Sequence, residues 1–389
     1  MKKTEIKTYL QQQKDDHRYR QRLVVDSPQG IELTIEGKKY LNFCSNDYLG
    51  LASHPRVINA LQEGARQYGA GSGASHLING HSRAHHQLEE ELASYVGRPR
   101  ALLFSTGYMA NLGVISALLG KGDAVFEDRL NHASLLDGGL LSQARLQRFQ
   151  HNDIDDLEKK LSSSKAETML VCTDGVFSMD GDLAKIKKLA DICKRYDTWF
   201  MVDDAHGLGV AGATGRGVLE SACASLDDVP ILVGTLGKAF GTFGAFVAGD
   251  NDLIELLIQR ARSYIYTTAL PPAVSEATRE SLKLMDEESW RRDKLNDNIK
   301  HFKKLATGIG LPDTQSDTAI QPIVLGNVKE TMKLSAKLKQ QGILVSAIRP
   351  PTVPEGTARL RITLCTDHSV EQIENLIDLL GDNMGKASK

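Results

Sequence analysis

Between residues 100 and 250, short apolar runs alternate with helical stretches, and this alternation limits the possible fold more than any other feature of the chain. Several runs are continuous β-branched or apolar segments, which is typical of strands buried on both faces. We predict strands at Ala101–Phe104, Ala124–Phe126, Arg145–Phe149, Thr168–Thr173, Thr198–Asp203, Pro230–Thr235 and Gly244–Ala248. Because helical stretches such as Leu183–Tyr196 separate most of them, we expect an α/β fold with a large, mostly parallel sheet wrapped by helices.

The pattern changes toward both ends of the chain. The first 50 residues are typical of a polar helix followed by a small hairpin, and the residues after 270 of a long helical region followed by a smaller α+β unit. At about 150 residues per domain, a chain of 389 residues suits two or three domains. We therefore expect an N-terminal segment over 1–45, a large α/β domain over 46–270 and a C-terminal α+β domain over 271–389.

Composition excludes several classes of protein. The formal net charge is −2 and hydrophobic residues make up 41%, which argues against a disordered chain and gives no global signal for nucleic acid or an anionic membrane. No apolar run approaches the ~18 residues of a membrane helix, and the basic N-terminus lacks the apolar stretch of a signal peptide. The five cysteines form no CxxC pair. We expect a cytoplasmic protein without a nucleic-acid or membrane partner.

A lysine flanked by glycines follows one of the apolar strands. The segment Gly234–Gly241 surrounds Lys238 with small or apolar residues, a setting that can desolvate the amine and lower its pKa. These are the conditions for a lysine that forms a Schiff base. The alternatives are an ordinary loop lysine or a phosphate-binding one. A Walker A loop is excluded, because Leu232 stands where that pattern requires glycine.

Two acids and a histidine follow the strand that ends at Asp203. Asp203, Asp204 and His206 come at its carboxyl end, where ligands bind in open α/β sheets. Adjacent strand residues point to opposite faces, so one acid can face a cofactor while the other caps or buttresses the turn. A capping acid and a surface histidine remain the alternative.

A glycine pattern overlaps this segment. Residues 207–212 match the dinucleotide pattern G-x-G-x-x-G, but Gly215 and Gly217 follow and indicate a loop instead of the helix that the pattern requires. A nucleotide-dependent oxidoreductase that uses residues 207–212 is the alternative function from a different class.

A turn and a helix start follow the first strand of the alternating region. In Phe104–Asn111 a strand ends, a Ser/Thr/Gly turn follows and a helix begins, so free N–H groups and the helix dipole favour a phosphate. A plain N-cap by Ser105 or Thr106 is the simpler interpretation, and both can hold together.

The histidines His81, His85 and His86 precede or begin a helix expected around residues 84–96. His81 and His85 are spaced i,i+4, yet no glutamate lies between them as in H-E-x-x-H, and no Cys or Asp nearby completes a ligand set. We therefore predict a solvated helix start and no metal. Asp174 and Asp180–Asp182 lack the spacing of a calcium loop.

A phosphate-binding turn, an acid at a strand end and a desolvated lysine are the three groups that bind pyridoxal 5′-phosphate (PLP). They occur here in that order, at Gly107, Asp203 and Lys238, and resemble the aspartate-aminotransferase-like enzymes of PLP fold type I. More specific segments resemble the α-oxoamine synthases over nearly the whole chain: Asn46–Gly50, Gly71–Ser75, Asn131–Ser134, Gly175–Gly181 and Gly234–Gly241. His76 departs from that family, in which many members carry arginine after the glycine-rich serine.

Two further segments narrow the resemblance. Ala347–Pro354 and Ala319–Pro322 are similar to the branch of the family that condenses L-alanine with a pimeloyl thioester in biotin synthesis. The resemblance implies a decarboxylative condensation that releases 8-amino-7-oxononanoate, CO₂ and the thiol of CoA or an acyl carrier protein. Other α-oxoamine synthases, such as glycine C-acetyltransferase or 5-aminolevulinate synthase, remain alternatives.

The resemblance also implies roles for individual residues. Lys238 would bind PLP and move the α-proton, Asp203 would keep the pyridine nitrogen protonated, and His132 would stack on the ring and meet the substrate. The remaining cofactor contacts would be Gly107, Tyr108, Ser178, His206, Thr235, Thr267 and Thr268, the last two reaching across a homodimer interface. The substrates would meet Arg20, Asn46, Thr352 and Arg361. Arg359 and Arg361 share a strand face, so either can grip the carboxylate.

Overall fold

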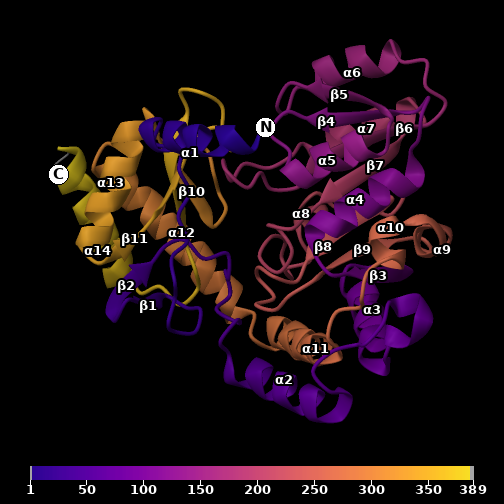
Figure 1. Cartoon of the computed structure of the whole chain (residues 1–389), viewed down its shortest axis with the longest axis horizontal. Coiled ribbons are helices and arrows are strands. Elements are labelled where there is room, and N and C mark those ends of the chain that lie inside the picture. The colour runs from indigo at the N-terminus through magenta and orange to yellow at the C-terminus, as the bar shows by residue number, and fades with distance from the viewer. Residues whose placement is uncertain (1, 386–389) are drawn as a thin grey trace. The chain divides into compact units, whose positions relative to one another are not determined.

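The structure is a computed structural model that describes residues 2–385, and its contacts divide the chain into two units (Figure 1). The central unit comprises residues 49–178 and 182–292, and the terminal unit comprises residues 2–48, 179–181 and 293–385. The predicted division differs in two respects. Residues 1–45 do not stand apart, because their hairpin pairs with a strand near residue 343. The central unit extends past 270 to residue 292, because the helix after 270 packs on two helices of that unit.

The central unit contains a seven-stranded sheet with the order β3-β9-β8-β7-β6-β4-β5. Its strands are β3 (Arg100–Phe104), β4 (Ala124–Asp128), β5 (Arg145–Phe149), β6 (Met169–Asp174), β7 (Trp199–Asp203), β8 (Ile231–Thr235) and β9 (Ala245–Gly249). All pairings are parallel except those of β9 with β3 and β8. The predicted mostly parallel sheet is confirmed, and each expected run forms a strand whose ends shift by at most two residues.

Helices connect these strands and surround the sheet (Figure 1). They are α2 (Pro55–Tyr68), η2 (His76–Gly80), α3 (Arg83–Tyr95), α4 (Gly107–Leu118), α5 (Ala133–Leu141), α6 (Ile154–Ser162), α7 (Ile186–Arg195), α8 (Val218–Ser221), α9 (Asn251–Arg260), α10 (Arg262–Ile265) and α11 (Pro272–Glu287). Helix α4 is apolar around most of its surface, and Ala110, Val114 and Ile115 join one core with sheet residues such as Val125 and Val233. The apolar contact between α4 and the sheet holds the helix in place. The first turn of α4 belongs to the site described below.

The terminal unit contains two three-stranded sheets, β1-β2-β11 and β10-β13-β12. Its strands and helices are η1 (Lys3–Glu5), α1 (Ile6–Asp15), β1 (Glu32–Ile35), β2 (Lys38–Asn42), most of α12 (Trp290–Gly308), β10 (Ile320–Gly326), α13 (Val328–Gln340), β11 (Ile343–Leu344), β12 (Ser346–Ile348), β13 (Ala358–Thr363) and α14 (Val370–Met384). Residues 343–348 form two short strands in different sheets, because β11 pairs with β2 and β12 with β13. Within the described residues, no helix is long and apolar enough to cross a membrane.

Candidate functional site

A pocket of the central unit gathers side chains from the carboxyl ends of neighbouring strands, the edge at which open α/β sheets bind ligands. Its lining comprises Gly107, Tyr108, His132, Ser134, Asp174, Val176, Ser178, Asp203, Ala205, His206, Thr235 and Lys238. The structure thus brings every residue predicted for the ring and phosphate of the cofactor to one place, except Thr267 and Thr268.

The first turn of α4 forms one wall of this pocket. Thr106 caps the helix, because its hydroxyl accepts a hydrogen bond from the backbone N–H of Met109 at 3.1 Å. The N–H groups at the start of an α-helix have no partner within the helix, so the turn at Gly107 and Tyr108 suits an anion. The Tyr108 hydroxyl donates a hydrogen bond to Asp137, which holds its ring at the pocket rim. The plain cap is therefore present, and phosphate binding at this turn stays a prediction that the cap does not oppose.

The two acids at the end of β7 serve different purposes. Asp203 lines the pocket, where one carboxylate oxygen accepts a hydrogen bond from the Asn111 amide at 2.6 Å and the other from the Ala205 N–H at 3.0 Å. Asp204 accepts from the Val218 N–H at 2.8 Å and is fully buried. Burial raises the pKa of Asp204 well above its ordinary value. The expected split between a site acid and a buttressing acid matches this geometry.

The glycines that imitate a dinucleotide pattern pack around this second acid. A Cβ atom added at Gly207 or Gly217 would lie 2.1 or 1.9 Å from a carboxylate oxygen of Asp204. The segment after Gly207 forms a loop that leads to the four-residue helix α8, as predicted. These glycines therefore have a packing reason that requires no nucleotide.

His132 stands at the start of α5 and is held from two sides. Its Nδ1 accepts from the Ser134 N–H at 3.3 Å and lies 2.7 Å from the Ser134 hydroxyl, while its own backbone N–H donates to Asp174 at 3.0 Å. Burial lowers the pKa of His132, the charge of Asp203 raises it and the charge of Lys238 lowers it again. Both charged groups of the pocket therefore act directly on this imidazole.

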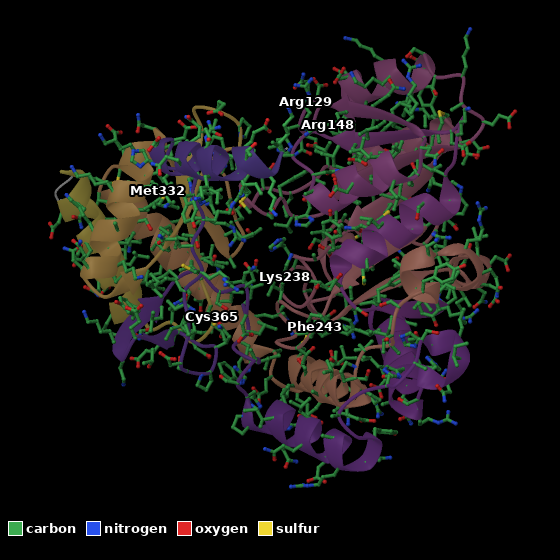
Figure 2. All side chains as sticks on the ribbon, viewed as in Figure 1. Arg129, Arg148, Lys238, Phe243, Met332 and Cys365 are labelled. Atoms are coloured by element: carbon green, nitrogen blue, oxygen red, sulfur yellow. The ribbon has the colours of Figure 1, made fainter. Side chains whose placement is uncertain are left out.

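Lys238 lies on the turn between β8 and β9, where Figure 2 labels it together with Phe243. Its carbonyl accepts from the Gly241 N–H at 2.8 Å, which closes the turn. Gly241 has φ +67°, and a Cβ there would lie 2.4 Å from the backbone nitrogen of Ala52, so only glycine fits. The glycines beside the lysine thus fix the backbone that carries the amine.

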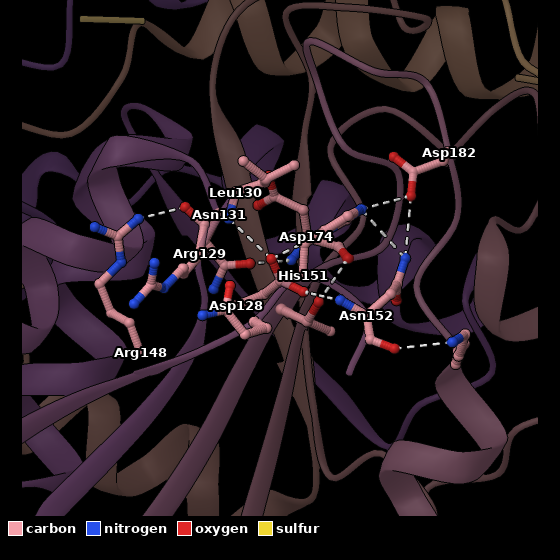
Figure 3. A network of polar contacts seen from close by, with 12 residues as sticks. Asp128, Arg129, Leu130, Asn131, Arg148, His151, Asn152, Asp174 and Asp182 are labelled. Atoms are coloured by element: carbon pink, nitrogen blue, oxygen red, sulfur yellow. Dashed lines mark hydrogen bonds and ion pairs between the residues drawn. The ribbon is translucent and has the colours of Figure 1, made fainter. Parts of the chain in front are cut away.

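The loop before His132 is anchored by a polar network (Figure 3). Asp128 accepts from the Leu130 N–H at 2.8 Å and from the Asn152 N–H at 2.8 Å. The ring of His151 lies between Asp128, 3.0 Å away, and Asp182, 2.8 Å away. Burial alone would lower the pKa of His151, but these two acids outweigh it and raise the pKa to about 10. The network therefore contains a cationic histidine that ties the strand ends together.

The terminal unit holds the residues predicted for the substrates, apart from His132. Both terminal nitrogens of Arg361 donate to the Asn46 side-chain oxygen at 3.2 Å. Arg359 instead forms an ion pair with Asp180 and donates to the Met179 carbonyl at 3.3 Å. Because Arg359 already serves a carboxylate of its own unit, Arg361 is the better candidate for a substrate carboxylate.

The two residues predicted for the acyl path also meet within this unit. The Arg20 guanidinium lies 3.4 Å from the Thr352 hydroxyl.

Two predicted cofactor residues do not reach the pocket of their own chain. Thr267 and Thr268 lie between α10 and α11, and Thr268 is exposed. Their expected role across a subunit interface stays a prediction.

The predicted solvated helix start is wrong for one of its histidines. His85 is fully buried, because its Nε2 donates to the Leu270 carbonyl at 2.7 Å and its Nδ1 accepts from the Ser82 N–H at 3.0 Å. His76, the residue that departs from the family, lies beside this group with its Nδ1 2.9 Å from Nδ1 of His81. No local pattern indicated that the glycine-rich loop and the helix start would bring four histidines together.

Two polar residues that line the pocket, Ser134 and Asp174, and one that contacts its lining, Asn111, escaped the sequence-based prediction of site residues. Asn111 and Ser134 bond to each other at 2.8 Å and link Asp203 to His132. Asp174 accepts the His132 N–H, and burial followed by the charge of Asp203 raises its pKa well above the ordinary value. The position of Asp174 at the carboxyl end of an apolar run was the available signal, since neighbouring parallel strands end at one edge.

Comparison with known proteins extends this geometry. The family model of class I and II aminotransferases matches residues 38–380. The chain is 57% identical to the 8-amino-7-oxononanoate synthase of Saccharophagus degradans over 387 residues, which covers 99% of this chain and 98% of the relative. It is 61% identical to the enzyme of the same name from Methylococcus capsulatus over 364 residues, 94% of each chain.

Solved structures similar to this chain include an enzyme of the same name as these relatives. A serine palmitoyltransferase variant from S. paucimobilis with a bound PLP–myriocin aldimine superimposes with a TM-score of 0.91 at 31% identity, covering 97% of this chain and 96% of that one. The 8-amino-7-oxononanoate synthase of Francisella tularensis gives a TM-score of 0.78 at 35% identity, covering 89% and 98%. The expected PLP fold type I is confirmed.

Proposed function

Since the chain belongs to the class I and II aminotransferase family, in which its near-full-length relatives are 8-amino-7-oxononanoate synthases, we propose that it condenses L-alanine with a pimeloyl thioester. The products are 8-amino-7-oxononanoate, CO₂ and the free thiol of the acyl carrier, a step of biotin synthesis. The observation that carries this proposal is the convergence of Asp203, Lys238 and the α4 N-terminus on one pocket of such a chain.

The residues of the pocket fit PLP. The α4 N-terminus and the Thr235 hydroxyl suit its phosphate, the carboxylate of Asp203 suits a protonated ring nitrogen, and the amine of Lys238 suits its aldehyde. His132 provides a flat imidazole on the same pocket wall, and His206 and Ser178 provide polar atoms beside it. When bound, PLP supplies an electron sink that stabilises negative charge at the α-carbon of the amino acid.

Each residue then has a defined task. Asp203 keeps a proton on the ring nitrogen, and Asn111 and the Ala205 N–H hold its carboxylate in place. Lys238 Nζ would hold the aldehyde of the cofactor, and the same amine would take the α-proton of alanine and return a proton to the product. His132 holds the cofactor ring, because its Nδ1 is committed to Ser134 and its orientation is therefore fixed.

Arg361 is the residue that we propose binds the carboxylate of alanine. A planar guanidinium can donate two parallel hydrogen bonds to a carboxylate, and Asn46 orients it by accepting from both terminal nitrogens. Arg20 and Thr352 bind the acyl substrate in this proposal. The contact between their side chains supports a shared role. The thiol carrier is CoA or an acyl carrier protein.

The remaining assignments concern the assembly. We propose a homodimer in the cytoplasm, in which Thr267 and Thr268 reach the phosphate of the partner's cofactor. The exposure of Thr268 outside its own pocket supports this arrangement.

A pairwise substrate assay tests the proposed reaction. L-Alanine and glycine are each combined with pimeloyl-CoA and acetyl-CoA, and release of CoA and of CO₂ is followed. We expect turnover with alanine and pimeloyl-CoA well above the other three pairs. Turnover confined to glycine with acetyl-CoA would refute the proposed substrates and favour a glycine C-acetyltransferase.

A further inference from the structure

A second polar cluster lies in the central unit, apart from the residues that line the PLP pocket. It occupies the start of α3 and the segment before it, and it borders a pocket of about 280 Å³. Ligand-type atoms of His81, His86 and Glu89 lie within 4.8 Å of one another there. Nothing in the proposed reaction uses these three side chains. Against the expectation from the sequence that no metal binds at these histidines, we propose that His81, His86 and Glu89 bind a divalent transition-metal ion of the zinc type.

The spacing of the three residues suits such an ion. His86 and Glu89 are separated by three positions on α3, so successive helix turns present them on one face. His81 comes from the turn before the helix, and its Nε2 lies 3.9 Å from a Glu89 carboxylate oxygen. Two imidazoles and one carboxylate form a ligand set that binds zinc with a fourth position left for water.

The second contacts of these ligands hold them in orientation. Nδ1 of His81 lies 2.9 Å from Nδ1 of His76. In the tautomer that carries the proton on Nδ1 of His81, the lone pair of its Nε2 faces Glu89. The other oxygen of Glu89 accepts from the Leu103 N–H at 2.9 Å. Metal ligands in proteins are commonly fixed through their second polar atom in this manner.

The three ligand side chains differ in exposure. The side chain of Glu89 is only 13% exposed and that of His81 29%, whereas His86 at the rim is 50% exposed. A divalent ion would compensate the buried carboxylate, and the open rim gives it a path of entry.

The alternative set of His76, His81 and His85 is weaker. Both ring nitrogens of His85 already hold hydrogen bonds, to Ser82 and to the Leu270 carbonyl. Binding a metal through His85 would break one of them at a fully buried site.

The test uses tag-free, PLP-loaded protein that has been freed of metal by chelation. Co²⁺ serves as the probe, since its visible d–d bands report a nitrogen- and oxygen-ligated site, and Zn²⁺ is then added as competitor. We expect one equivalent of Co²⁺ per chain, displaced by Zn²⁺, and an affinity at least about tenfold lower in His86→Gln and in Glu89→Gln.

A matched control and a fold check complete the design. His301→Gln removes a histidine that pairs with Glu374 at 3.3 Å elsewhere in the chain, and it should bind Co²⁺ like the unmodified protein. The absorbance of bound PLP confirms that each variant is folded. If Glu89→Gln does not fold, the half-exposed His86 decides the question. Sub-stoichiometric binding, or equal binding by the unmodified protein and His86→Gln, would overturn the proposal.

Discussion

At the scale of single residues, neighbouring side chains of one type carry different tasks because strand geometry separates them. Asp203 and Asp204 follow each other on β7, yet the first lines the pocket and the second accepts from the Val218 N–H in a glycine-lined recess. Arg359 and Arg361 lie on one strand face, yet the first is paired with Asp180 and the second is held by Asn46. These pairs provide matched controls for the proposed roles.

Exchange of the two acids for amides should separate chemistry from packing. Asp203→Asn removes the charge that holds the proton on the PLP nitrogen, so we expect kcat to fall by about 10²–10⁴-fold, the range for positioned acid–base groups. Asp204→Asn should keep cofactor absorbance and most activity, because burial already raises the pKa of Asp204 and an amide oxygen can accept from Val218. Steady-state kinetics of both variants checks this, and equal loss in both would contradict the assignment.

The two arginines give a corresponding test of the substrate site. Arg361→Lys loses the planar fork and should raise the KM for alanine by roughly 10–100-fold, the equivalent of one charge-assisted hydrogen bond. Arg359→Lys should leave that KM unchanged and reduce stability instead, because its partners are Asp180 and Met179. A raised KM only in the Arg359 variant would exchange the two roles.

Sequence patterns identified those single residues that occupy characteristic positions. Lys238 between glycines, Asp203 at a strand end and Gly107 at a helix start carry local signals, and the structure brings them together. Asn111 gave no such signal, because its position inside α4 is ordinary. Its role depends on the hydrogen bond that it donates to Asp203, 92 residues away in sequence. The buried state of His85 likewise depends on the Leu270 carbonyl, 185 residues distant.

At the scale of elements, polar contacts link the carboxyl ends of β4, β5 and β6. Asp128 ends β4, His151 follows β5 and Asp182 follows the turn after β6, and the three side chains form one network (Figure 3). Because the His132 backbone bonds to Asp174 on β6, the network supports the loop that carries a pocket residue. We regard His151 as a positioning residue.

The raised pKa of His151 predicts a pH-dependent contribution to stability. Its pKa is about 10 in the folded protein and ~6.5 in an unfolded chain, so the folded state binds the proton more tightly. The contribution is complete below about pH 6.5 and is lost as the pH rises toward 10. We expect the unfolding free energy of the unmodified protein to exceed that of His151→Gln most at pH 6 and least at pH 10.

Urea unfolding of both proteins across this range measures the difference. A gap that widens with rising pH would contradict the ion pairs.

Element boundaries were predictable where the apolar pattern and the capping residues agree. Helix α2 begins at Pro55, a residue type that favours the first turn of a helix, and β5 coincides with its expected run. The long helical region after residue 271 was expected as one piece, but α11 ends at Glu287 and α12 begins at Trp290. No proline or glycine marks this break, so tertiary packing decides it.

At the scale of the whole molecule, the chain is assembled from segments distant in sequence. The N-terminal hairpin shares a sheet with β11, and residues 179–181 belong to the terminal unit although they lie inside the central stretch. Periodicity describes neighbours along the chain and cannot show these long-range pairings, so the predicted three-part division missed them. Resemblance over the whole chain gave the fold type, which the comparisons confirm.

Mixed dimers test the proposed sharing of phosphate contacts between subunits. One partner carries Lys238→Ala, and the other carries Thr267→Ala together with Thr268→Ala. A dimer with one subunit of each kind contains one intact site. Random mixing makes about half of the dimers such hybrids, so we expect about a quarter of the unmodified activity. Activity equal to the mean of the two separate variants would show that each site is built from one chain.

The central claim is that Lys238 carries PLP in the pocket beside Asp203. Borohydride reduction of the purified coloured protein, followed by proteolysis and mass spectrometry, makes the link permanent and locates it. We predict loss of the visible absorbance and a single modified peptide that contains Lys238, with no label in Lys238→Ala. Label on another lysine, or protein that stays colourless and unlabelled after added PLP, would contradict the account.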